Sequence, residues 1–82
     1  MKIELSRGAA KQLEKLPKDE ARKVVRKLHF LESTPLSGKK LSGKLNEEYS
    51  VRAWPYRIIY IIISSDKIIL IEKIEHRQGV YK

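Results

Sequence analysis

The segment Tyr49–Tyr60, which reads YSVRAWPYRIIY, decides the fold of this 82-residue chain. Apolar residues at positions 49, 51 and 53 alternate with Ser50 and Arg52, a period of two that is typical of a strand with one covered face. Trp54-Pro55 interrupts this strand and predicts a turn, because proline cannot donate a ladder hydrogen bond. Residues 57–63 are rich in β-branched side chains and apolar on both faces, which predicts a central strand.

The residues on either side extend this pattern in both directions along the chain. Ser64–Lys67 is a polar turn, and Ile68–Ile74 predicts the third strand of an antiparallel meander. At the other end, Lys2–Leu5 alternates polar and apolar residues and predicts a short opening strand. The sheet is therefore expected to contain an N-terminal strand and three C-terminal strands.

Two helices are predicted between the first strand and the meander. Ser6 is a suitable N-cap for a helix whose apolar face is Ala9, Leu13 and Leu16. Pro17 ends that helix and suits the first turn of the next one, which Pro35 closes. The second helix has an apolar stripe opposite a basic face; the stripe is Ala21, Val24, Val25, Leu28 and Leu31, and the basic face is Arg22, Lys23, Arg26 and Lys27.

Residues 36–48 contain two Ser-Gly pairs and three lysines and are interpreted as a basic loop. The predicted order is thus β-α-α-β-β-β, an α+β fold with an antiparallel sheet and a two-helix hairpin on one face. The length suits one domain, residues 1–82. The apolar run Ile58–Ile63 is expected in the middle of the sheet, since exposure would favour aggregation.

Charge and composition restrict the function classes. A formal net charge of +8 favours a partner that is nucleic acid or an acidic protein. Without cysteine there is neither a disulfide nor a thiolate site, and with only two histidines, His29 and His76, far apart in the chain, no zinc site is expected. The N-terminus lacks the apolar core of a signal peptide, and no apolar stretch is long enough to span a bilayer. A cytoplasmic protein with no metal or other cofactor is expected.

Basic residues on the three C-terminal strands form the candidate site. Arg52 shares a face with Ser50, Arg57 points the same way as Ile59 and Ile61, and Lys73 shares parity with Ile69 and Ile71. In a meander, Arg52, Arg57, Lys73 and Arg77 can converge and bind phosphate. The alternative is that each arginine is solvated or paired with a carboxylate, the candidates being Glu48, Glu72 and Glu75.

Several segments together are similar to one known family. Tyr49–Tyr60 resembles the YRIRVGDYRVIYEI core of the RelE/ParE toxin superfamily, and Ile74–Tyr81 resembles its HRxxVY tail. Ser6–Leu16 is similar to its S..A.K.L.KL helix, and Leu41–Leu45 to its L.G.L loop. The match extends over nearly the whole chain in the same order.

The resemblance implies the toxin of a type II toxin–antitoxin pair, with a fold like that of small microbial ribonucleases. RelE-like members enter the ribosomal A site and cleave mRNA by attack of its own 2′-hydroxyl, without a metal. An antitoxin partner is implied, with an acidic, partly disordered segment that wraps over the basic toxin in a hetero-oligomer.

The same resemblance assigns candidate residues. The arginines of the YR core and HR tail fall on Arg57 and Arg77, and the tail tyrosine falls on Tyr81. Two basic residues of the preceding strand fall on Ser50 and Arg52, so one of them is missing here. Lysines of the basic loop are the candidate substitutes: Lys39, Lys40 and Lys44.

The acid–base groups for this chemistry are less well determined by the sequence. His76 is the candidate acid or base, because an imidazole suits proton transfer near neutral pH. Tyr81 is a candidate base if neighbouring cations favour its ionised form.

Two alternatives stay open. A ParE-like toxin shares the fold but inhibits DNA gyrase and has no nuclease site; the His76-Arg77…Tyr81 tail argues against it. A degenerate member that binds RNA or antitoxin without cleavage is the other alternative, because Ser50 stands where the family has a basic residue.

Overall fold

The computed structural model describes residues 1–42 and 48–77. The expected elements are present within a residue or two of their predicted bounds. In chain order they are β1 (Lys2–Leu5), α1 (Arg7–Lys15), α2 (Lys18–Ser33), β2 (Lys39–Ser42), β3 (Glu48–Ala53), β4 (Tyr56–Ile63), a 3-10 turn (Ser64–Asp66) and β5 (Ile68–His76). In the part of the chain that is described, neither helix is long and apolar enough to cross a membrane.

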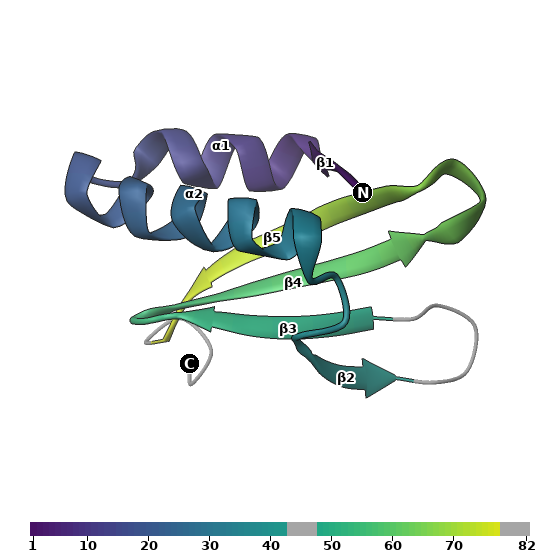
Figure 1. Cartoon of the computed structure of the whole chain (residues 1–82). Coiled ribbons are helices and arrows are strands. Elements are labelled where there is room, and N and C mark those ends of the chain that lie inside the picture. The colour runs from purple at the N-terminus through teal and green to yellow at the C-terminus, as the bar shows by residue number, and fades with distance from the viewer. Residues whose placement is uncertain (43–47, 78–82) are drawn as a thin grey trace.

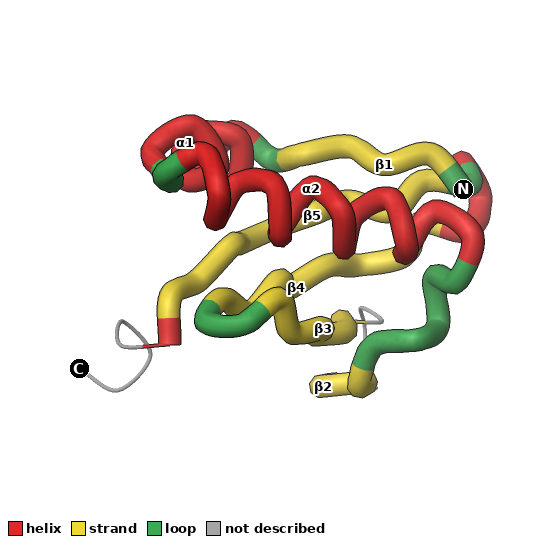
Figure 2. The backbone as a smooth tube through the Cα atoms, turned by 60° about the vertical axis from the view of Figure 1, so that its left-hand side comes forward, coloured by secondary structure: helices red, strands yellow, loops and turns green. Residues whose placement is uncertain are grey.

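The strands form one five-stranded sheet in the order β1-β5-β4-β3-β2. β1 runs parallel to β5, and the other neighbours are antiparallel. Both helices lie on the same side of this sheet (Figure 1), and Figure 2 shows β1 and β2 at its opposite edges. The predicted α+β fold, with a helical hairpin on one face, is confirmed, as is the position of Ile58–Ile63 in the middle of the sheet. The sheet is mixed rather than antiparallel throughout as predicted, because β1 runs parallel to β5.

The interpretation of residues 36–48 as a loop was wrong in part. Lys39–Ser42 forms β2, an edge strand in which Lys39 pairs with Ser50 and Lys40 with Tyr49. Lysines next to a Ser-Gly pair are typical of a loop, so the sequence pattern did not indicate this strand. Lysine is nevertheless a common residue on edge strands, where its charge discourages pairing with other chains.

The core lies between the helices and the covered face of the sheet. The side chains of Tyr56, Ile58 and Tyr60 on β4 point toward the helices and are at most 8% exposed. Val24, Leu28 and Leu31 pack on them from α2, as predicted. Val25 was wrongly included in the apolar stripe, because its side chain is 37% exposed.

A β-bulge changes the phase of β5. Tyr60 pairs with Ile71, but the preceding residue of β4, Ile59, pairs with Lys73, so that Glu72 is the extra residue. Beyond Glu72, the residues of β5 that face the helices are therefore Ile74 and His76. The parity that the sequence assigns to Lys73 fails for this reason: Ile71 faces the helices and Lys73 does not.

Side chains of α1 satisfy backbone groups of β5 around the bulge. The Ser6 hydroxyl donates to the Glu72 carbonyl at 2.9 Å, and the Ile74 N–H donates to Oε1 of Gln12 at 2.9 Å. Ser6 also caps α1, since its Oγ accepts from the Ala9 N–H at 3.0 Å. These contacts cover the part of β5 that β1 is too short to reach.

The Tyr60 hydroxyl anchors the connection between α2 and β2. It donates to the Pro35 carbonyl at 2.8 Å and accepts from the Gly38 N–H at 3.1 Å. A Cβ at Gly38 would lie 2.5 Å from that hydroxyl and 2.8 Å from the Ser50 carbonyl, so only glycine fits without a shift. Burial raises the pKa of Tyr60, which keeps the hydroxyl protonated as a donor.

We expect Tyr60→Phe to lower the free energy of unfolding by about 1–3 kcal/mol, because two backbone groups lose their partner in a shielded position. Urea denaturation measures the change. Tyr49→Phe is the matched control, since the structure gives the Tyr49 hydroxyl no hydrogen bond to a described residue. Equal losses in the two variants would contradict the anchoring role.

Candidate functional site

The face of the sheet opposite the helices, here the open face, collects most of the predicted cationic residues. Arg52 of β3 is directly opposite Arg57 of β4. In the neighbouring row, Lys39, Ser50, Ile59 and Lys73 follow one another across β2, β3, β4 and β5. The sheet therefore brings Arg52, Arg57, Lys39 and Lys73 onto one surface.

The two arginines are not neutralised by the carboxylates nearby. Glu75 is the neighbour of Arg57 on β5. Among the described residues, however, no carboxylate oxygen lies within 4.0 Å of either guanidinium. Like charges directly opposite each other destabilise a sheet. Within the described structure Arg52 and Arg57 are therefore not in ion pairs, and their positive charge is available to an anionic ligand.

Arg77 follows β5 and lies against the turn between β3 and β4. Its backbone N–H donates to the Pro55 carbonyl at 2.9 Å. Its guanidinium carbon is 4.8 Å from the centroid of the Trp54 ring, in a cation–π contact. Arg77 is thus held at the end of the sheet where Arg52 and Arg57 pair.

The remaining predicted residues are not brought into this cluster. His76 pairs with Tyr56 on the helix side, and the two rings meet edge to face with centroids 5.1 Å apart. The bulge is the physical reason, since an unbroken alternation would place His76 on the open face. Lys40 also points to the helix side, opposite Tyr49. Tyr81 and Lys44 lie outside the described residues.

The open face also contains a carboxyl pair that the sequence did not reveal. Burial raises the pKa of Glu72 from its usual value, and the neighbouring Glu48 carboxyl raises it further, while Lys73 lowers it. Oε1 of Glu72 is shielded from solvent and has no hydrogen-bond partner within the described structure. Glu48 and Glu72 come from β3 and β5, which lie on either side of β4, so it is the strand order of the folded sheet that shows the two side chains to be neighbours.

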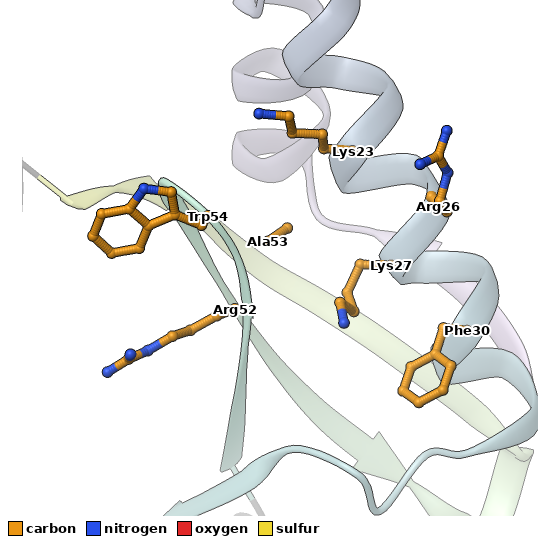
Figure 3. A pocket seen from close by; sticks show the side chains of 7 residues that line it. All are labelled: Lys23, Arg26, Lys27, Phe30, Arg52, Ala53 and Trp54. Atoms are coloured by element: carbon orange, nitrogen blue, oxygen red, sulfur yellow. The ribbon is translucent and has the colours of Figure 1, made fainter.

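A groove lies between α2 and the edge of β3 beyond the end of β2 (Figure 3). It encloses about 460 Å³. Its lining combines cationic side chains with apolar ones: Lys23, Arg26, Lys27 and Arg52 with Phe30, Ala53 and Trp54. Lys27 Nζ lies 5.0 Å from the centroid of the Phe30 ring.

A family model described as the ParE toxin of the type II toxin–antitoxin system parDE matches residues 3–81. The chain belongs to this family. The toxin is 31% identical over 84 residues to the putative toxin RelE1 of Methanocaldococcus jannaschii. This alignment covers 98% of the chain and 93% of the relative. It is therefore a RelE-like toxin of a type II toxin–antitoxin system.

Solved structures of toxin–antitoxin complexes contain chains with the same fold. The archaeal RelE–RelB complex from Pyrococcus horikoshii OT3 matches with a TM-score of 0.82 and 29% identity, over 93% of both chains. The RelBE2 complex from Mycobacterium tuberculosis matches with a TM-score of 0.81 and 29% identity, over 93% of this toxin and 96% of that chain. The recognition of the RelE/ParE superfamily from the sequence is confirmed.

We expect Glu72→Gln to stabilise the toxin at pH 7. Because the pKa of Glu72 is raised in the folded state, folding favours the protonated carboxyl, and ionisation costs stability as the pH rises above the ordinary pKa of 4.5. Below about pH 4 the acid is protonated in both states, so the advantage of glutamine should disappear there. Urea denaturation at the two pH values, with the exposed Glu4→Gln as control, measures it. A variant less stable than wild type at pH 7 would show that the charged form is favoured.

Proposed function

We propose that this toxin is a ribosome-dependent endoribonuclease that cleaves mRNA. In this proposal residues 1–82 form one domain. The observation that supports it most is the strand register that sets Arg52 opposite Arg57 on the open face, with Arg77 held at the same end. Guanidinium groups match the geometry of phosphate oxygens and bind them through paired hydrogen bonds. An unneutralised cluster of this kind suits a polyanionic substrate.

The proposed reaction is attack by the RNA's own 2′-hydroxyl oxygen on the adjacent phosphorus. The bond from phosphorus to the 5′-oxygen breaks, a base takes the 2′-hydroxyl proton, and an acid protonates the leaving oxygen. Negative charge builds up on the phosphoryl oxygens in the transition state, where fixed cations stabilise it more than they stabilise the ground state. In this proposal the guanidinium groups supply that positive charge.

We assign the phosphate at the cleavage point to Arg57 and Arg77, and its neighbours to Arg52 and the lysines of the open face, Lys39 and Lys73. The acid–base steps are assigned to the tail. His76 packs on Tyr56 on the helix side of β5, so its assignment rests on the resemblance and on its exposed position at the strand end, directly before Arg77. Tyr81 is kept as the second group by resemblance alone, and Lys40 and Lys44 as additional RNA contacts.

Arg57→Ala and Arg77→Ala should each lower the rate of mRNA cleavage by about 10²–10³, as loss of one fixed charge at a transition state does. The measurement is cleavage of a defined mRNA in a purified translation system, with and without ribosomes that have an empty A site. Arg22→Ala, which removes an exposed arginine on α2 that lies 4.0 Å from Asp19, is the matched control and should cleave like wild type.

DNA gyrase inhibition is a second candidate, because the matching family model carries the ParE description. A folded wild-type toxin that cleaves no mRNA but blocks supercoiling by purified gyrase would establish it and overturn the nuclease proposal. Cleavage at full rate by both arginine variants would instead overturn the proposed roles of Arg57 and Arg77.

We also propose that the toxin acts in the cytoplasm and that its partner there is an antitoxin, as in the RelE–RelB complexes. In this proposal a segment of the antitoxin with acidic and apolar residues occupies the groove beside α2. Arg26 and Lys27 have no ion pair with a described carboxylate, so an acidic ligand would neutralise them. Phe30, Ala53 and Trp54 supply apolar contacts. Apolar anchors with charges at the rim are the usual composition of such sites.

Reversing two charges of the groove should weaken the antitoxin complex. We expect the double variant Arg26→Glu and Lys27→Glu to raise the Kd for the antitoxin encoded beside this toxin by about 10- to 100-fold, because like charges would then face each other. Biolayer interferometry measures it. The control is Lys11→Glu with Lys15→Glu on the exposed face of α1, which changes net charge equally; the same loss in both would indicate a net-charge effect rather than a site.

A further inference from the structure

We propose that Trp54 is a positioning residue, whose indole ring holds the Arg77 guanidinium at the end of the open face where it meets the RNA phosphate. The inference depends on the proposed function, because it assigns the geometry of a group that the proposed cleavage uses. It adds to the site a residue that acts by positioning another side chain and does not contact the phosphate itself.

Both ends of Arg77 are attached to the same turn. The Pro55 carbonyl accepts the Arg77 backbone N–H at 2.9 Å, which fixes where the side chain starts. The Trp54 ring, 4.8 Å from the guanidinium carbon, fixes where it ends. Arginine has many accessible rotamers in water, so one backbone bond alone would leave the guanidinium mobile. The ring restricts it to one region.

The turn places that region beside the other two arginines. Figure 3 shows the side chains of Trp54 and Arg52 extending in the same direction, away from α2. Arg52 is paired with Arg57 across β3 and β4. A guanidinium lying on the Trp54 ring is therefore held near the Arg52–Arg57 pair.

Charge repulsion among the three arginines makes the contact between Trp54 and Arg77 necessary. Three guanidinium groups at one end of a small sheet repel one another, and without a ligand Arg77 would move away into solvent. The negative face of an indole ring attracts a cation, and tryptophan does this best among the aromatic residues. The ring therefore offsets part of the repulsion before any RNA arrives.

Packing does not account for Trp54. Its side chain is 56% exposed, the highest value among the large aromatic residues that the structure describes as exposed. A residue with a purely structural role would be expected to bury more of this surface. The contact with Arg77 and the edge of the groove are the contacts that the structure gives the ring.

A double-mutant cycle tests the proposal. Trp54→Leu should lower single-turnover mRNA cleavage by about two- to fivefold, the worth of an exposed cation–π contact. Trp54→Phe, which keeps an aromatic ring, should recover most of that loss. In the Arg77→Ala background, Trp54→Leu should cause no further loss, because the group that it positions is gone.

Three outcomes of the cycle would overturn the positioning role while the proposed function stands. They are full activity in Trp54→Leu, the same fractional loss with and without Arg77, and a Trp54→Phe variant no better than leucine. A folded wild type that cleaves no mRNA would overturn the proposed function and this inference together.

A second measurement does not depend on cleavage. In NMR spectra, the side-chain Hδ and Hε resonances of Arg77 should be shifted upfield by the ring current of Trp54, and Trp54→Leu should remove the shift. Arg22, which lies away from the ring on α2, gives the reference values. Unshifted Arg77 resonances in the wild type would overturn the proposal even for an active nuclease.

Discussion

The two-residue Trp54-Pro55 turn fixes the register of β3 against β4, and in that register Arg52 faces Arg57 across the strands. Like charges in this arrangement lower the stability of a sheet by a few tenths of a kcal/mol to about 1 kcal/mol. The core must offset that cost, and it does so on the other face of the same residues, where Tyr56 and Ile58 of β4 are buried under the helices. Stability and the candidate site are thus separated onto the two faces of one strand pair, and the same turn also holds Arg77.

The one-sided placement of the helices determines what remains exposed. Because α1 and α2 cover the same face, the open face keeps its cations at the end near the turn and half-buried isoleucines of β4 farther along. The bulge at Glu72 lies between these regions, and the half-buried Glu72 carboxyl is a neighbour of the Glu48 carboxyl. On the edge of the sheet, the groove beside α2 offers a different chemistry, cationic and apolar together. The molecule therefore has two surfaces, one suited to an RNA backbone and one to an acidic protein segment, and they meet at Arg52 and Trp54.

Much of this architecture could be predicted from the sequence, because strand alternation and helical spacing are local properties. Parity indicated that Arg52 and Arg57 can converge on one face, but their direct pairing depends on the strand register, which parity does not give. Local patterns could not reveal the bulge, since one extra residue in β5 changes no composition, yet it moves Lys73 to the open face and His76 to the covered one. β2 was missed because its lysines look like a loop until the edge of β3 is known to need a partner. The contact between Trp54 and Arg77 joins residues that are distant in sequence, and only the folded turn brings them together.

The most direct test of the central claim is a cryo-electron microscopy structure of the toxin on a ribosome whose A-site codon carries 2′-O-methyl groups, so that attack by the 2′-oxygen is blocked. The account predicts the codon on the open face, with a phosphate between two nucleotides of the codon in contact with the guanidinium groups of Arg57 and Arg77 and near Arg52. A codon bound on the helix side of the sheet, or a toxin bound outside the A site, would contradict it.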